Sequence, residues 1–198
     1  EISACLVGSE MCIRDSLCID LKSFYASVEC VELGLDPFEV NLVVADPTRG
    51  GGAITLAATP AIKKLGVSSR GRIFEIDPKI EYMITPPRMH LYMEYSCKVY
   101  KVFLEFIAKE DIHVYSIDES FLDVTSYLKL YQVSAKNLAK KILDRTYEKT
   151  GLTATVGIGT NLYLAKIAMD ISAKHNADRM AYLNAVSYTH LRAHETGR

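Results

Sequence analysis

Three carboxylates close to short apolar segments are the residues of this chain best suited to catalysis. Asp20 lies near the end of the run LCIDL, and Asp118 and Glu119 are adjacent in the stretch VYSIDESFLDVT. If these segments are neighbouring strands, the acids converge, and cations or protons must offset their repulsion. Carboxylate oxygens suit Mg²⁺, and two such ions about 3.5–4 Å apart can activate an attacking oxygen and stabilise a leaving one. The residues alone also allow Asp118 and Glu119 to be solvated turn residues.

Strand and helix signals around these acids predict an α+β fold. Apolar or alternating runs are typical of strands, and apolar residues three and four positions apart are typical of helices. The expected strands are 17–21, 112–117, 120–124, 153–159 and 180–183, and the expected helices are 23–35, 89–107, 134–151 and 161–175. This order predicts a mixed sheet with helices on one face, the split-βαβ (ferredoxin-like) plan. Residues 36–88 interrupt it as a small inserted α/β subdomain, with two strands within 41–59, a helix at 60–66 and a stiff extended joint at 85–87.

Capping residues set the expected limits of three helices. Ser23, Ser134 and Asn161 precede helical runs and are suitable N-caps, because their side chains can accept hydrogen bonds from the first backbone amides. Gly34 and Gly151 follow two of these runs and are suitable helix stops.

Length and composition limit the class of protein. With 198 residues, 49% of them hydrophobic, and a net charge of −1, the chain is expected to form one or two soluble globular domains. No apolar run reaches the roughly 18 residues that a membrane span needs. The five cysteines are scattered, which favours reduced thiols and a cytoplasmic location over disulfides or a zinc site. They are Cys5, Cys12, Cys18, Cys30 and Cys97.

The two ends of the chain differ from its middle. Residues 1–16 and 187–198 lack helix or strand periodicity and resemble translated sequencing-adaptor read-through. Native disordered termini are the alternative interpretation. Both ends are therefore left out of the expected fold, and His190 and His194 are not treated as a metal-binding pair.

Four stretches of the middle of the chain resemble the Y-family (translesion) DNA polymerases, the group that includes UmuC and DinB. CIDLKSFYASVE and YSIDESFLDVT are similar to the two catalytic motifs of that family. TATVGIGTNLYLAKIAMDISAKHN is similar to its strand and helix with a phosphate-binding lysine, and LAATPAIKKLGV is similar to its fingers helix. The resemblance covers about residues 17–184 in unbroken order and points to the UmuC-like branch of Gram-positive bacteria.

The resemblance implies a two-metal nucleotidyl transfer. Asp20, Asp118 and Glu119 would bind two Mg²⁺ ions, for which Mn²⁺ is a substitute, and the backbone carbonyl of Leu21 would be a further ligand. Asp20 and Asp118 would bridge both ions, whereas Glu119 would favour the ion that activates the primer 3′-hydroxyl. The reaction would lengthen the primer and release pyrophosphate.

The resemblance also implies a set of nucleotide-binding residues. Tyr25 matches the steric gate that excludes a 2′-hydroxyl, and Phe24 would support the sugar pocket, although both could equally be core aromatics of the helix. Lys166 would contact the triphosphate. Lys63 and Thr59 match other triphosphate contacts of the fingers, although a lysine on a helix is usually just solvated.

A domain plan and a set of partners follow from the same resemblance. Residues 17–35 and 89–186 would form the palm and residues 36–88 the fingers, while the thumb and little finger that grip the duplex would follow residue 186 and are absent. The implied partners are primer–template DNA, deoxynucleoside triphosphates and, through the absent regions, a sliding clamp, in DNA repair and the SOS response. Phosphate contacts dominate DNA affinity, so the chain alone is expected to bind DNA weakly.

Two other functions remain open beside translesion DNA synthesis. A nucleotidyl cyclase uses a similar palm and two metals on a ribonucleotide, but Tyr25 as a gate and the insertion at 36–88 argue against it. A catalytically silent polymerase-like accessory protein of a DNA-repair complex would have no need of Asp20, Asp118 and Glu119. Template-directed DNA synthesis across damaged DNA is therefore the leading hypothesis.

Overall fold

The computed structural model describes residues 14–189 of the chain. The predictions for Cys5, Cys12, His190 and His194 lie outside the described residues. Within 14–189, no helix is both long and apolar enough to cross a membrane.

The backbone divides into two compact units. Among the described residues, the first comprises residues 14–20, Leu104–Ile142 and residues 155–189, and the second comprises Leu21–Phe103 and Leu143–Ala154. The second unit therefore combines the inserted segment with three segments that the family resemblance assigns to the palm, residues 21–35, 89–103 and 143–154. The palm and fingers boundaries stay a prediction.

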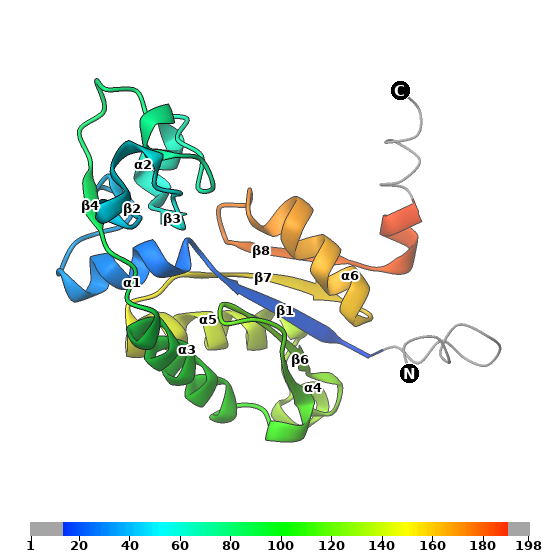
Figure 1. Ribbon diagram of the computed structural model, residues 1–198. Coiled ribbons are helices and arrows are strands. Elements are labelled where there is room, and N and C mark those ends of the chain that lie inside the picture. The colour runs from blue at the N-terminus through cyan, green and yellow to red at the C-terminus, as the bar shows by residue number, and fades with distance from the viewer. Residues whose placement is uncertain (1–13, 190–198) are drawn as a thin grey trace. The chain divides into compact units, whose positions relative to one another are not determined.

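A five-stranded mixed sheet forms the centre of the first unit (Figure 1). Its strands are β1 (Ser16–Leu21), β5 (Ile112–Val114), β6 (Glu119–Asp123), β7 (Ala154–Gly159) and β8 (Met180–Leu183), in the order β5-β6-β1-β7-β8. β6 pairs antiparallel with both β1 and β5, and β7 pairs parallel with β8. The order β5-β6-β1-β7 is that of the split-βαβ plan, which confirms the predicted fold class, and β8 extends the sheet beyond β7.

Two strand limits differ from the sequence prediction. β1 begins at Ser16, a residue assigned to the foreign tail, because Ser16 pairs with Asp123 at the end of β6. β5 ends at Val114 rather than at residue 117, because the backbone amides of Tyr115 and Ser116 both donate to the Glu119 carbonyl and turn the chain.

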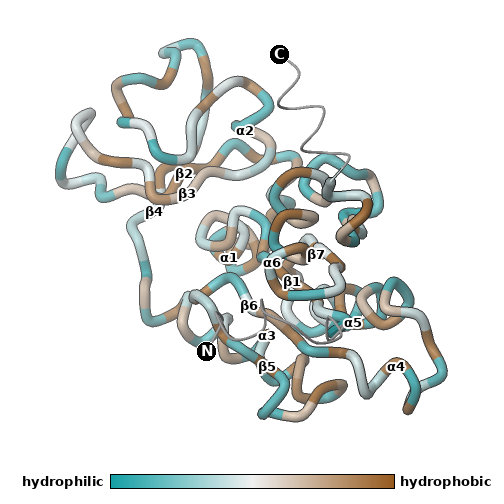
Figure 2. Tube along the Cα trace, turned by 90° about the vertical axis from the view of Figure 1, so that its right-hand side faces the viewer, coloured by the Kyte–Doolittle hydropathy of each residue, from teal (hydrophilic) through white to brown (hydrophobic). Residues whose placement is uncertain are grey.

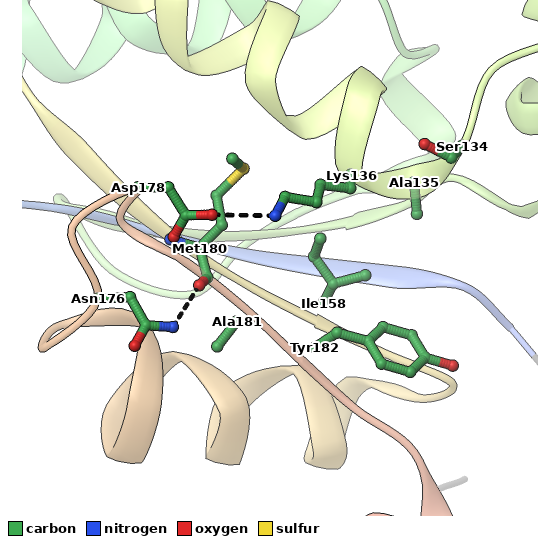
Figure 3. A pocket seen from close by; sticks show the side chains of 9 residues that line it. All are labelled: Ser134, Ala135, Lys136, Ile158, Asn176, Asp178, Met180, Ala181 and Tyr182. Atoms are coloured by element: carbon green, nitrogen blue, oxygen red, sulfur yellow. Dashed lines mark hydrogen bonds and ion pairs between the residues drawn. The ribbon is translucent and has the colours of Figure 1, made fainter.

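Helices cover both faces of this sheet, so the prediction of one covered face is wrong (Figure 3). α5 (Ala135–Thr150) begins on one face, and α6 (Leu162–Ile167) lies on the other. The predicted caps of these helices are confirmed, since Ser134 accepts from the Asn137 amide and Asn161 accepts from the Leu164 amide. α6 continues directly into a π-helix, η5 (Ala168–Ala173), and the short helices α4 (Thr125–Tyr131) and η4 (Lys109–Asp111) complete the unit.

Two glycines of β7 allow α6 and η5 to approach the sheet closely. A Cβ atom on Gly157 would overlap the Ala165 carbonyl oxygen and the Met169 amide nitrogen, and one on Gly159 would overlap the Ala165 amide. Because the obstructing atoms belong to the backbone, they cannot move aside as a flexible side chain would. The lack of a side chain at these positions therefore fixes the distance between helix and sheet.

Gly157→Ala is expected to destabilise the protein by about 3 kcal/mol, the upper part of the range for overpacked cores. The added methyl group must push the helix away from β7. Urea unfolding followed by circular dichroism measures the change, with Gly52→Ala as the matched control, because a Cβ on Gly52 meets nothing within 4 Å. Equal stability of the two variants would contradict this explanation of the packing.

The second unit contains a three-stranded sheet built from the inserted segment. Its strands are β2 (Leu42–Val44), β3 (Ala57–Ala58) and β4 (Met83–Thr85), in the order β3-β2-β4. Figure 2 shows β2 as a hydrophobic stretch, and its Val43 packs with Ala58, Ile62 and Ile76 in a small core. The sequence predicted only an extended joint next to β4, whose pairing with β2 depends on residues about 40 positions away.

The helices of the second unit follow the sequence prediction closely. They are α1 (Phe24–Glu32), α2 (Pro60–Lys64) and α3 (Met89–Leu104), with the short η2 (Pro47–Gly52) and η3 (Ile73–Glu75). Gly34, at a φ of 67°, follows α1 as the predicted stop. Ser23 precedes α1 but does not cap it with its side chain; its backbone is left-handed, and its Oγ instead accepts from Lys63 Nζ at 2.9 Å.

Candidate active site

The strand register brings two of the three predicted acids opposite each other. Asp20 on β1 pairs directly with Glu119 on β6. Cys18 lies two residues before Asp20 and therefore on the same face of the sheet, where it packs against Ala165 and Met169. The acid pair thus lies on the face that α6 and η5 cover.

The third acid, Asp118, ends the turn that leads into β6. Its Oδ1 accepts a hydrogen bond of 2.6 Å from Ser116 Oγ. Burial raises the pKa of Asp20, and the negative charges of Asp118 and Glu119 add to this rise, while Lys174 opposes it. All three carboxylates therefore interact electrostatically, as the sequence analysis expected.

Two lysines from the covering helices neutralise the facing acids. Lys166 Nζ lies 2.6 Å from Glu119 Oε1, and Lys174 Nζ lies 3.4 Å from Asp20 Oδ2. Asp170 lies between them in the sequence and pairs with both, at 3.3 Å from Lys166 and 2.9 Å from Lys174. The result is an alternating network of two ammonium groups and three carboxylates.

This network keeps the two lysines charged. Burial alone would lower the pKa of Lys166, but hydrogen bonds and charges from Glu119 and Asp170 outweigh it, and the pKa is raised. The pKa of Lys174 is also raised, because Asp170 and Asp20 together outweigh its burial. Both lysines therefore remain positively charged beside acids that the resemblance assigns to metal binding.

The three acids provide the oxygen donors that a magnesium site needs. In the structure, however, each carboxylate is directed at another side chain rather than at a common point. Among residues 14–189, no three His, Cys, Asp or Glu side chains are grouped closely enough to hold a metal ion. Glu119 is directed at Lys166, Asp20 at Lys174 and Asp118 at Ser116. Carboxylate oxygens at neighbouring strand ends are still the donors that Mg²⁺ prefers. The metal-binding roles, including that of the Leu21 carbonyl at the end of β1, stay predictions.

Cys18 is an additional contact of the acid pair that the sequence analysis did not single out. Burial, and then the charge of Glu119, raise the pKa of the Cys18 thiol. The thiol therefore stays protonated, and it donates to Glu119 Oε1 at 3.3 Å. Cys18 thus helps to fix the position of the Glu119 carboxylate.

The predicted sugar-pocket residues form an aromatic group in the second unit. Tyr25 is half-buried, and its ring lies against that of Tyr92, with centroids 4.4 Å apart and planes 13° from parallel. Phe24 is buried and contacts both rings at tilted angles. Both interpretations of these aromatics, as a gate and as part of a core, are compatible with this packing.

The two predicted phosphate contacts of the fingers differ in their surroundings. Lys63 on α2 is exposed and donates to Ser23. Thr59 is fully buried; its hydroxyl donates to the Val40 carbonyl at 2.7 Å and accepts from the Leu42 amide at 3.1 Å. A phosphate would have to displace these backbone bonds, so the role of Thr59 in nucleotide binding stays a prediction.

The sequence analysis did not single out several residues of the site. Asp170 and Lys174 follow Lys166 at spacings of four, a signal of helical ion pairs that the sequence analysis left unused. Glu29 on α1 binds Arg88 and Tyr92, which lie 59 and 63 residues further along the chain. No local pattern reports such a contact.

A separate cavity of about 500 Å³ lies beside β8 (Figure 3). None of its lining residues is among the predicted site residues, and two of them, Lys136 and Asp178, form an ion pair of 3.0 Å. The lining consists of Ser134, Ala135, Lys136, Ile158, Asn176, Asp178, Met180, Ala181 and Tyr182.

Comparison with known proteins gives consistent matches. Residues 19–170 match the model of the impB/mucB/samB family. The chain is 40% identical over 171 residues to UvrX of Bacillus subtilis, to which UV-damage repair is ascribed, and 39% identical over 162 residues to DNA polymerase IV 2 of the same species. These matches cover 85% and 80% of this chain but only 39% and 38% of the relatives. The insertion ternary complex of Dbh DNA polymerase superposes with a TM-score of 0.72 at 26% identity, over 89% of this chain and 51% of Dbh.

Proposed function

This chain belongs to the impB/mucB/samB family, the UmuC/DinB group of Y-family DNA polymerases, and we propose that it carries the catalytic part of an enzyme that copies damaged DNA. The observation that supports this most strongly is the pairing of Asp20 with Glu119, next to Asp118, on the sheet face where Lys166 lies. The chain spans less than half of the relatives named above, so the activity is proposed for the whole protein of which it forms part.

The acids provide the chemistry of nucleotidyl transfer. Asp20, Asp118 and Glu119 are the ligands proposed for two Mg²⁺ ions, which would supply an activated primer hydroxyl and charge stabilisation at the leaving pyrophosphate. β1 and β6 hold Asp20 and Glu119 in register, and the turn before β6 supplies Asp118. Rigid strand ends position the carboxylates before substrate binds.

Lys166 binds the triphosphate in this proposal. Its side chain is one-third exposed, and its ammonium group already lies beside Glu119. An incoming polyphosphate offers it a stronger anionic partner than one carboxylate, because a triphosphate carries several charges. The ion pairs of Lys174 with Asp170 and Asp20 remain when Lys166 exchanges Glu119 for the triphosphate.

Tyr25 and Phe24 select the sugar. Tyr25 follows Asp20 by five positions, and its ring would leave no room for a 2′-hydroxyl. Lys63 is retained as a second phosphate contact because the residue is exposed. Primer–template DNA, deoxynucleoside triphosphates and a sliding clamp are the proposed partners, and the cytoplasm is the proposed location because chromosomal DNA is the substrate.

Template-directed synthesis past a damaged base is the expected activity of an extended enzyme, which we define as this chain joined after residue 186 to the C-terminal part of UvrX. Primer extension opposite an intact base and opposite an abasic site measures it. Addition of nucleotides at both templates, dependent on Mg²⁺, is the expected result. Cyclic nucleotide formed from ATP would instead indicate a cyclase, and a folded protein without either activity would indicate a silent accessory protein.

A further inference from the structure

Tyr115 is a solvent-exposed residue of the turn between β5 and β6, the same turn that carries Asp118. The residue is 63% exposed, and its backbone amide donates to the Glu119 carbonyl at 3.0 Å. This hydrogen bond fixes the point at which the Tyr115 side chain leaves the turn. The segment that supplies two of the three acids therefore also presents an aromatic ring to solvent.

The Tyr115 ring lies on the sheet face that carries the acid pair. It packs edge-on against Phe121, with ring centroids 5.7 Å apart and planes at 90°. Phe121 follows Glu119 by two positions on β6, so the two side chains lie on the same face of the sheet, where Phe121 packs in a core with Met169. Phe121 therefore supports one side of the Tyr115 ring, and much of the rest of the ring stays open to solvent.

Lys166 lies between this ring and the acids. Its Nζ is 6.0 Å from the centroid of the Tyr115 ring, the outer limit of a cation–π contact, and 2.6 Å from Glu119 Oε1. The ring and the Glu119 carboxylate are thus separated by a single ammonium group. A nucleotide that binds next to Glu119 lies within reach of the Tyr115 ring.

The proposed reaction determines which nucleotide this is. Glu119 is the proposed ligand of the ion that activates the primer 3′-hydroxyl, so the last nucleotide of the primer must lie next to it. The base of that nucleotide is paired with the template, which leaves its sugar and phosphate for contact with the protein. The carbon atoms of the sugar offer an apolar surface to an aromatic ring.

We propose that Tyr115 binds the sugar of the last primer nucleotide and so holds the 3′-hydroxyl at the metal site. The ring supplies apolar contact area, and Phe121 keeps the ring from turning away. This inference rests on the proposed function, because it needs a primer end at Glu119.

Exposure alone does not make a tyrosine a binding residue, because single exposed apolar side chains are common on protein surfaces. Tyr182 is 56% exposed and lies on β8, at the edge of the same sheet opposite to β5. It lines the separate cavity and is not one of the predicted site residues. Tyr182 is therefore the matched control for Tyr115, equal in residue type and exposure but different in position.

The test measures two KM values of the extended enzyme in single-nucleotide incorporation, one for primer–template and one for dATP. Tyr115→Ala is expected to raise the KM for primer–template about eightfold, because burial of about 50 Å² of apolar surface strengthens binding by about that factor. The KM for dATP is expected to stay unchanged. Tyr115→Phe, which keeps the ring, and Tyr182→Ala are expected to leave both values unchanged.

A purely structural role of the ring predicts a different result. Without its support the turn would shift Asp118, and the Mg²⁺ concentration needed for half of the maximal rate would rise. The sugar contact leaves that concentration unchanged, so a higher Mg²⁺ requirement in Tyr115→Ala would overturn the inference. Should Tyr115→Ala melt below the assay temperature, Tyr115→Leu decides, since leucine still covers Phe121 but loses about half of the contact and is expected to raise the KM for primer–template about threefold.

Failure of this inference and failure of the proposed function give different results. An active extended enzyme in which the Ala and Leu variants of Tyr115 leave the KM for primer–template unchanged would overturn the inference alone. A higher KM for dATP instead would also overturn it, because the ring would then act on the incoming nucleotide through Lys166. A folded extended enzyme that extends no primer would overturn the proposed function and the inference with it.

Discussion

Replacing Asp118 with alanine in the extended enzyme is expected to lower the rate of nucleotide incorporation by about a thousandfold, as expected when a group that stabilises the transition-state charge is removed. Asp118 is one of the two ligands, with Asp20, that would bridge both metal ions, so its loss would affect the attacking and the leaving oxygen together. Its neighbours Asp20 and Glu119 are held by strand pairing and stay in place. Single-turnover primer extension at saturating Mg²⁺ measures the rate.

Asp118→Asn separates charge from structure. An asparagine keeps an acceptor oxygen for the hydrogen bond from Ser116 but carries no charge. It is therefore expected to lose activity as alanine does. Its melting temperature in EDTA is expected to stay the same or to rise, because one source of repulsion acting on Asp20 is gone. Asp178→Ala, at an exposed aspartate paired with Lys136, is the control and is expected to remain fully active.

If the Asp118→Asn enzyme is active, Asp118 is not one of the metal ligands, and this part of the proposal is wrong. Loss of activity accompanied by a lower melting temperature would also contradict the account, because it would assign Asp118 a structural role in the turn before β6.

Joining this chain to the C-terminal part of UvrX is expected to raise its affinity for primer–template DNA by two orders of magnitude or more at about 150 mM salt. The chain has a net charge of −1, and the cations Lys166 and Lys174 are paired with acids. The chain therefore has no net excess of positive charge with which to bind the duplex backbone. Each phosphate that a protein neutralises adds about 0.9 to the steepness with which log K falls against log salt concentration. About five additional phosphate contacts in the extended enzyme would therefore make the fall of log K with log salt concentration measurably steeper.

Fluorescence anisotropy of labelled primer–template between 50 and 200 mM KCl measures this steepness. The chain alone is expected to give a value near one, and the extended enzyme a value of about five or more. The C-terminal part of UvrX by itself is the control for binding that does not involve this chain. A steep salt dependence and tight binding by the chain alone would show that the duplex-gripping surface lies within the 198 residues.

Most of the architecture could be predicted because local patterns and tertiary structure agree. Apolar runs marked each strand of the five-stranded sheet, and Ser134, Asn161 and Gly151 marked helix ends as expected. β4 was missed because its pairing with β2 involves a segment 41 positions away and only three residues. All helices were predicted on one face of the sheet, whereas α6 and its extension lie on the face opposite α5, because the close approach that Gly157 allows is a tertiary property.

The acids of the site could be predicted, whereas their partners could not. Motif and strand signals together identified Asp20 and Glu119, and strand pairing then places them opposite each other. Lys174 reaches Asp20 from the end of the π-helix, and a π-helix changes the direction in which a following side chain leaves the helix. No residue pattern in the sequence predicts this change of side-chain direction. The same is true of the contact between Glu29 and Arg88, which joins distant parts of the chain.

The most direct test of the metal site is anomalous X-ray scattering from crystals of the chain grown with Mn²⁺ and a deoxynucleoside triphosphate. Two anomalous peaks about 3.5–4 Å apart are expected, both within bonding distance of Asp20 and Asp118 and one of them also bonded to Glu119. Lys166 is expected to have left Glu119 for the triphosphate. Bound triphosphate without Mn²⁺ at these three carboxylates, or Mn²⁺ at other residues only, would contradict the proposed catalytic site.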